Sequence, residues 1–134
     1  MPKIHTTERF RVVHDSRMRP DDWKRFVEFP HFTRKWRDLG MDDDDLRALQ
    51  LMLTVQPHLG PVISGTGGLR KVRFSRHGSG KRSGVRIGYA YYDEFGIVCL
   101  ITVYAKSEQE DISAGTRKQI AKLLRVVGSY LDSE

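Results

Sequence analysis

Cationic side chains are the residues of this chain best suited to chemistry, and they gather in one stretch. Between Gly65 and Lys106 the sequence holds eight basic residues and two acidic ones, a net charge of +6, so the rest of the chain is neutral overall. A patch of this kind attracts polyanions, chiefly nucleic acid, through counterion release and electrostatic steering. Composition alone leaves open the alternative that it is a solvated basic surface that keeps the protein in solution.

Two glycine-rich segments within this stretch resemble nucleotide-binding loops but fail the pattern. The segment Gly65–Arg70 lacks the final glycine of a dinucleotide fingerprint, and Gly78–Ser83 has arginine after its lysine, where a P-loop needs serine or threonine. Both also lead into predicted strands, whereas those motifs open helices. We therefore exclude an NTPase or a dehydrogenase, and we expect Gly78–Ser83 to form a flexible basic hairpin tip that follows a phosphate backbone.

Metal-binding and nucleophilic patterns are weak. The five histidines show no paired spacing, and the single cysteine, Cys99, lies in an apolar stretch where we expect it to be buried. The acidic run Asp42–Asp45 precedes the apolar residues Leu46 and Leu49, so it favours a capped helix start over a metal site. We expect neither a metal nor a cofactor.

Hydrophobic periodicity places the cations on a sheet. One strand, two helices, three strands at period two and a last helix that Ser113 caps predict an α+β fold in which a three-stranded antiparallel meander is covered by helices mainly on one face. The predicted strands are Trp23–Phe29, Leu69–Ser75, Val85–Tyr92 and Ile97–Ala105, with a further short strand conceivable at Phe10–Val13; the first two helices begin at Pro30 and after Asp42.

Alternation along the meander sorts its side chains by face. With no bulge, Val72, Phe74, Ile87, Tyr89, Tyr91, Cys99, Ile101 and Val103 belong to apolar rows that cover the helices. The opposite face gathers cations and a phenol above two small residues, Gly88 and Ala90. That set, which forms a phosphate-sized concavity, comprises Lys71, Arg73, Arg86, Tyr104 and Lys106.

The length and the apolar content bound the organisation of the chain. With 134 residues and 39% hydrophobic residues, we expect a single domain over residues 23–134 and an N-terminal extension over residues 1–22 that forms a mobile arm. No apolar run reaches the roughly 18 residues of a membrane span, and no apolar segment follows the first charges as in a secretory signal. We expect a cytoplasmic protein without a membrane partner.

Three blocks of the sequence together resemble RelE-family toxins, in particular their HigB-like branch. They are Leu59–Arg73, Gly80–Ile87 and Leu100–Glu108, and Glu110–Ile112 before the last helix also matches. The resemblance covers about residues 23–131 and implies a RelE-like fold and a single RelE-like toxin domain. It further implies a toxin of a type II toxin–antitoxin module, an endoribonuclease (mRNA interferase) that cleaves messenger RNA on the 70S ribosome. The implied partner is a cognate antitoxin with a helix-turn-helix.

The resemblance also assigns roles by position. The family's basic pair on the first meander strand matches Lys71 and Arg73, its phosphate-clamping arginine matches Arg86, and a basic residue at the end of the last strand is Lys106 here. The tyrosine that RelE uses aligns near Ile112, so Tyr104 is the substitute that we expect. Metal-independent cleavage by the 2′-OH needs a base, an acid and cations around the phosphorane. Lys71 is the candidate base, Lys106 or Tyr104 the acid, and the expected RNA contacts around them are Arg70, Arg76, Lys81 and Arg82.

Two other functions use the same residues. A non-catalytic RNA- or ribosome-binding domain needs the basic face without an acid or a base. A protein-interaction module meets an acidic partner with that face. Discrete cuts in messenger RNA distinguish the nuclease from the binder, and a salt-dependent affinity for RNA distinguishes both from the protein-interaction module.

Overall fold

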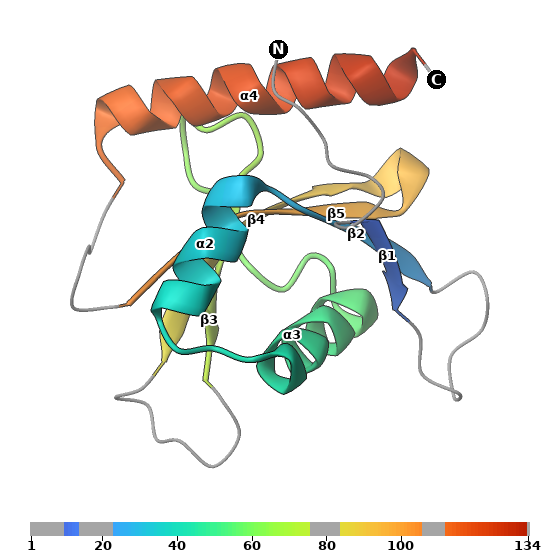
Figure 1. The fold of residues 1–134 in the computed structure, drawn as a ribbon. Helices are drawn as coiled ribbons and strands as arrows, with labels where there is room; N and C mark the ends of the chain where they lie inside the picture. Colours follow the sequence, from blue (N-terminus) through green and yellow to red (C-terminus); the bar gives the residue numbers. More distant parts are fainter. Residues whose placement is uncertain (1–9, 14–22, 76–83, 106–111, 134) are drawn as a thin grey trace.

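The computed structural model describes residues 10–13, 23–75, 84–105 and 112–133. They form an α+β domain whose mixed sheet has five strands in the order β1-β2-β5-β4-β3 (Figure 1). The predicted order of one strand, two helices, an antiparallel meander and a last helix is confirmed. The elements are β1 (Phe10–Val13), β2 (Lys24–Glu28), α2 (Pro30–Asp38), α3 (Asp43–Val55), β3 (Arg70–Phe74), β4 (Val85–Tyr92), the short 3-10 turn η3 (Asp93–Phe95), β5 (Ile97–Ala105) and α4 (Ala114–Asp132).

The helix starts follow from their capping residues. Pro30 occupies the first turn of α2, where its missing N–H costs nothing. The carboxylate of Asp42 accepts the Asp45 N–H at 2.8 Å, and the carboxylate of Asp45 accepts the Asp42 N–H at 2.9 Å, which is a complete capping box. Ser113 caps α4 by accepting the Thr116 N–H at 3.2 Å. The acidic run is therefore the start of a helix, as its position predicts.

The sheet has a parallel pair at its centre. β2 runs parallel to β5, and β5, β4 and β3 form the predicted antiparallel meander. β1 pairs antiparallel with β2, so the conceivable strand at Phe10–Val13 is present and extends the sheet from within the N-terminal segment. The division of the chain at residue 22 stays a prediction.

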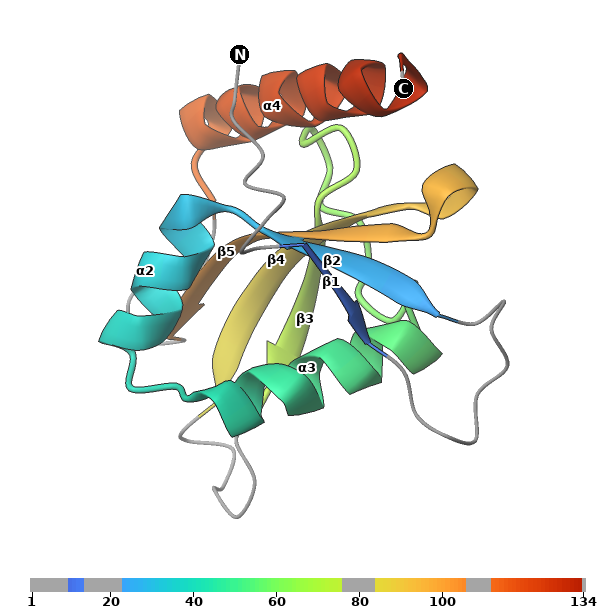
Figure 2. The ribbon, with the colours of Figure 1, turned by 45° about the vertical axis from the view of Figure 1, so that its right-hand side comes forward.

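Helices cover both faces of the sheet, which corrects the expectation that they pack mainly on one. α2 and α3 lie on one side and α4 on the other (Figures 1 and 2). One core cluster joins Phe32, Trp36 and Leu49 to β4 and β5, and a second joins Leu124 and Val127 to the opposite side of the same strands. The reason is that the first five residues of β5, Ile97–Ile101, are all apolar, so both faces of this part of the strand are buried.

A β-bulge in β5 corrects the predicted faces of that strand. Gly88 pairs with Thr102 but Tyr89 pairs with Leu100, so Ile101 has no partner in the register. As a result Val103 faces α2 and α3, whereas Cys99 and Ile101 face α4. The alternation without a bulge had put these three residues on one face. Beyond the bulge, Tyr104 keeps the face that was predicted for it, because it pairs directly with Arg86.

Candidate functional site

Four of the five residues predicted to act in catalysis share one face of three adjacent strands. Arg73 on β3 pairs with Arg86 on β4, and Arg86 pairs with Tyr104 on β5, so these three side chains form one row across the meander. Lys71 pairs with Gly88 in the neighbouring row of the same face. Strands in a sheet lie about 4.7–4.9 Å apart, so adjacent members of the row are near neighbours. We call Lys71, Arg73, Arg86 and Tyr104 the sheet site.

The cations of the sheet site are reachable from solvent and the phenol is not. Arg73 is exposed, and Lys71 and Arg86 are half-buried. Tyr104 is only 5% exposed, so its ring contributes little to the open surface of the site. Two guanidinium groups on neighbouring strands suit one phosphate, because each can donate two hydrogen bonds to a pair of oxygens.

Gly88 has no side chain, so the surface next to the row of Arg73, Arg86 and Tyr104 is recessed there. A Cβ atom added to Gly88 would lie 2.6 Å from Cγ2 of Thr102, closer than two carbon atoms can approach. The second small residue of the predicted floor, Ala90, lies in the core cluster under α4 and is 4% exposed. The predicted concavity therefore has Gly88 in its floor but not Ala90, because α4 covers the far end of β4.

One of the predicted RNA contacts, Arg70, is not on this face. Arg70 lies on the opposite face of β3, and its guanidinium donates to the carbonyls of Gly60 at 2.7 Å and of His58 at 3.3 Å. That guanidinium therefore holds the loop that leads into β3. The remaining predicted residues Arg76, Lys81, Arg82 and Lys106 lie outside the described residues.

The glycine-rich segment before β3 is a structural loop. Gly65, Gly67 and Gly68 all have positive φ, and a Cβ at Gly67 would lie 3.3 Å from Cα of Ala121 on α4. Thr66 is fully buried, donates to the Ile63 carbonyl at 2.6 Å and accepts the Leu69 N–H at 3.0 Å. The rejection of this segment as a nucleotide loop agrees with that packing.

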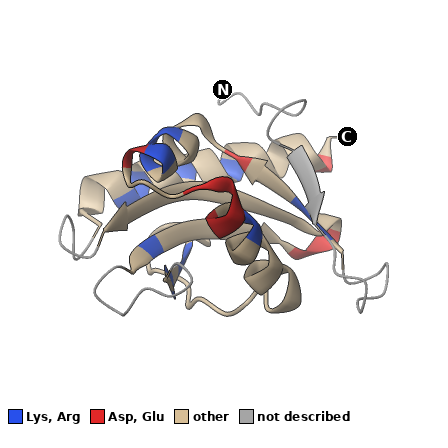
Figure 3. Cartoon of the chain, turned by 60° about the horizontal axis from the view of Figure 1, so that its bottom comes forward, with Lys and Arg blue, Asp and Glu red and all other residues tan. Residues whose placement is uncertain are grey.

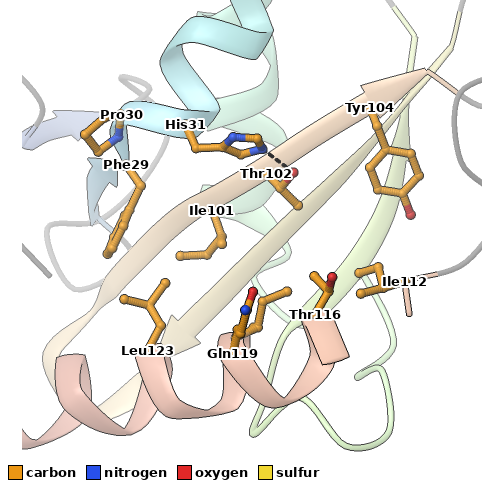
Figure 4. Close-up of a pocket in the computed structure, with 11 residues that line it drawn as sticks. Phe29, Pro30, His31, Ile101, Thr102, Tyr104, Ile112, Thr116, Gln119 and Leu123 are labelled. Atoms are coloured by element: carbon orange, nitrogen blue, oxygen red, sulfur yellow. Dashed lines mark hydrogen bonds between the residues drawn. The ribbon is translucent and has the colours of Figure 1, made fainter. Parts of the chain in front are cut away.

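A pocket lies next to the sheet site, between β5, the start of α2 and the first half of α4 (Figure 4). Its volume is about 460 Å³. Tyr104 and Thr102 line it from β5, so the pocket and the row share a wall. The full lining is Phe29, Pro30, His31, Ile101, Thr102, Tyr104, Ile112, Thr116, Gln119, Ile120 and Leu123.

His31 is the functional candidate that the sequence analysis missed. Its Nε2 lies 3.2 Å from Oγ1 of Thr102 at the edge of the pocket. Burial, followed by the charges of Arg34 and Lys35, lowers the pKa of His31 below its usual value of 6.5. The imidazole is therefore neutral at pH 7 and can both donate and accept a hydrogen bond. The sequence held no signal for it, because Thr102 is 71 positions away.

Tyr89, Tyr92 and Cys99 are packing residues. Tyr89 is fully buried on the predicted core face; its hydroxyl donates to the Pro57 carbonyl and accepts the Gly60 N–H. The hydroxyl of Tyr92 donates to the Leu124 carbonyl of α4 at 2.8 Å. Cys99 is fully buried, and burial raises the pKa of its thiol to about 12, so it is not a nucleophile.

Neither charge density nor a metal cluster marks another site in the described part of the chain. Figure 3 shows Lys and Arg, in blue, on α2 and α4 as well as on the sheet. No group of three or more His, Cys, Asp or Glu residues able to hold a metal ion occurs among the described residues. No helix among them is long and apolar enough to cross a membrane. The register of the meander, rather than the amount of charge, therefore defines the candidate site.

Comparison with known proteins shows a likeness to a solved structure. No family model matches the chain. Among solved structures, a mutant of the E. coli toxin RelE in the free state is similar, with a TM-score of 0.45 and 18% sequence identity. The match covers 63% of this chain and 85% of the RelE chain. At this identity and TM-score, the likeness carries nothing about the activity of this protein or about the HigB-like branch.

Proposed function

We propose that this protein is an endoribonuclease that cleaves translated messenger RNA on the 70S ribosome, as the toxin of a type II toxin–antitoxin module. The observation that supports this most directly is the sheet site, where Arg73 and Arg86 face the same solvent-accessible surface in direct register. The three sequence blocks that resemble the HigB-like branch of RelE-family toxins support it independently. Cleavage of message during translation stops protein synthesis and growth.

The reaction needs no metal. The ribose 2′-oxygen attacks the adjacent phosphorus, the bond from phosphorus to the 5′-oxygen breaks, and the products are a 2′,3′-cyclic phosphate and a free 5′-OH. The proton lost from the 2′-OH goes to a base, and an acid supplies one to the departing 5′-oxygen. Negative charge builds on the phosphorane oxygens, and fixed cations stabilise it.

The sheet site provides groups for these steps. Arg73 and Arg86 bind the phosphate oxygens, and Lys71, one row away on the same face, takes the 2′-proton. Tyr104 or Lys106 protonates the leaving oxygen. Arg76, Lys81 and Arg82 contribute attraction for the RNA backbone, whereas Arg70 holds the loop at Gly60 from the opposite face of β3.

The partners that go with this activity are messenger RNA on the ribosome and a cognate antitoxin with a helix-turn-helix DNA-binding region. The protein works in the cytoplasm, where both are found. A basic, solvent-reachable face is what an RNA substrate requires, and it also suits an acidic segment of an inhibitor. No cofactor takes part.

A non-catalytic RNA- or ribosome-binding domain is the second candidate. The observation that favours it is the burial of Tyr104, which at 5% exposure presents little of its surface to a substrate. In that case the guanidinium groups hold phosphates and no proton is transferred. The two candidates differ in whether the message is cut.

Induced expression, with and without the adjacent open reading frame, tests the proposal. We expect growth arrest from the protein alone, relief by a cognate antitoxin, and discrete in-frame cuts in primer extension on a translated message. The fragments should carry 2′,3′-cyclic phosphate and 5′-OH ends. Growth arrest with intact message would establish the binding domain instead, and loss of RNA binding in every salt condition would remove both.

A further inference from the structure

We propose that the pocket beside the sheet site holds one unstacked nucleobase of the RNA whose phosphate Arg73 and Arg86 bind. This inference rests on the proposed function and adds a base-recognition site to it. The lining that carries the argument is Phe29, His31, Ile101, Thr102, Tyr104 and Gln119.

Continuity with the phosphate site is the first reason. Tyr104 pairs with Arg86 in the sheet, and its ring also lines the pocket. Thr102 pairs with Gly88, which itself lies opposite Lys71. The pocket is therefore reached from the cationic row by moving one strand across the same face. The base and the phosphate of one nucleotide are also close together, because only the ribose separates them.

The size and the walls of the pocket suit a planar aromatic ring. Its volume of about 460 Å³ lies within the range of about 300–1,000 Å³ that is typical of small-molecule sites. Ile101 on β5 and Leu123 on α4 supply apolar surface from the sheet and the helix, and Phe29 adds an aromatic ring from the start of α2 (Figure 4). Proteins that recognise single-stranded RNA commonly place unstacked bases against aromatic and apolar side chains in this way.

Polar groups at the edge of the pocket suit the edge of a base. Nε2 of the neutral His31 imidazole is hydrogen-bonded to the Thr102 hydroxyl, and the tautomer of the ring decides which of the two groups donates. Gln119 lines the pocket from α4, and its amide carries a donor and an acceptor side by side, as needed to pair with a purine or pyrimidine edge (Figure 4). No Asp, Glu, Lys or Arg occurs among the lining residues, so the pocket suits an uncharged ring better than a second phosphate.

Methyl NMR spectra locate the base directly. The probes are adenosine 5′-monophosphate and ribose 5-phosphate, which carry the same phosphate and differ by the base. We expect the nucleotide, and not the sugar phosphate, to shift the methyl signals of Ile101, Ile112 and Leu123. Equal effects of the two probes on these methyl groups would overturn the proposal while leaving phosphate binding intact.

A pocket-filling substitution measures the contribution of the base. We expect Thr116→Trp to weaken binding of a short single-stranded RNA by about tenfold, the scale of one lost base contact. It should not change binding of the same backbone made without bases. Ser129→Trp places the same side chain on exposed α4 surface outside the pocket and should change neither affinity.

These experiments distinguish a failure of the pocket proposal from a failure of the proposed function. If Thr116→Trp binds the base-containing RNA as tightly as the unchanged protein does, the pocket proposal is wrong. If Arg86→Ala in the same experiment weakens binding of both backbones, the phosphate site is supported even though the pocket proposal is wrong. If the unchanged protein binds neither RNA nor nucleotide, the proposed function fails, and the pocket proposal fails with it.

Discussion

Arg73 on β3 and Arg86 on β4 lie directly opposite one another on the same face of the sheet. Like charges in this position destabilise a strand pair by roughly 0.2–1 kcal/mol relative to neutral residues. The apolar partners on the other face, such as Val72 and Ile87, have no such cost. An anion bound between the two guanidinium groups would remove the repulsion, so the arrangement is what a phosphate site requires.

The first prediction concerns that repulsion. Replacing Arg73 by glutamine should raise the free energy of unfolding by up to about 1 kcal/mol at low ionic strength, because the opposed charge is gone. Urea denaturation at low salt measures it. The gain should shrink at about 1 M salt, where the Debye length is about 3 Å. A variant that is less stable than the unchanged protein at low salt would contradict this account.

The second prediction concerns activity. Arg86→Ala should reduce cleavage of translated message about 100- to 1000-fold, because one of the two cations that stabilise the phosphorane is lost. Primer extension and growth measure the effect, and thermal unfolding shows whether the fold is kept. Arg125→Ala, which removes an exposed cation from α4, is the matched control and should stay toxic. Full toxicity of Arg86→Ala would remove that residue from the site.

The third prediction concerns the floor of the site. Gly88→Ala should cost about 1–3 kcal/mol in stability, since the new Cβ would lie 2.6 Å from Cγ2 of Thr102. Combining it with Thr102→Ser deletes the clashing methyl group and keeps the hydroxyl that contacts His31, so stability should return. Urea denaturation of the two single variants and the double variant gives the coupling. Independent, additive effects would show that the clash is not the cause.

The fourth prediction concerns pH. Because the pKa of folded His31 is lowered, the unfolded chain binds more protons in the range just below pH 6.5. The contribution of His31 to stability is therefore present above pH 6.5 and lost as the pH falls through the folded pKa. His31→Gln should lose less stability than the unchanged protein between pH 7.5 and pH 5. The same decline in both proteins would show that the imidazole titrates alike in the folded and unfolded states.

The fifth prediction concerns the start of α3. Asp42→Ala should cost about 1 kcal/mol, since it removes the side-chain acceptor of the capping box. Asp44→Ala, on the exposed first turn of the same helix, loses only a favourable charge at the helix end and should cost less. Thermal unfolding of the two variants compares them. An equal cost would mean that the charge matters and the cap does not.

Much of the fold was predictable because its signals are local. Period two placed Lys71 and Arg73 on one face of β3 and Val72 and Phe74 on the other, and the register of the sheet agrees. The Asp42 cap also depends only on neighbouring residues. For the same reason the faces of Lys71, Arg73 and Arg86 were visible in the sequence, since β3 and β4 alternate clearly, and Tyr104 follows the same pattern because it lies beyond the bulge of β5.

The remaining features depend on pairing between distant segments. The bulge at Ile101 arises where β4 and β5 meet, and alternation within β5 alone does not reveal it. The apolar run of β5 is compatible with one buried face or two, so the position of α4 could not be derived from it. The contact of His31 with Thr102 joins α2 to a strand late in the chain. Arg70 counted as an RNA contact by charge, yet its guanidinium binds backbone carbonyls of the preceding loop.

The additional residue at the bulge of β5 shifts, halfway along the strand, the alternation of side chains between the two faces of the sheet. Ile101 and Thr102 consequently project to the same side, one as hydrophobic cover for α4 and the other into the pocket. A chain shortened by one residue at this point would keep Tyr104 opposite Arg86, but the pocket would lose the wall that Ile101 provides. Deletion of a single codon would thus leave the proposed phosphate contacts aligned while altering the proposed base pocket.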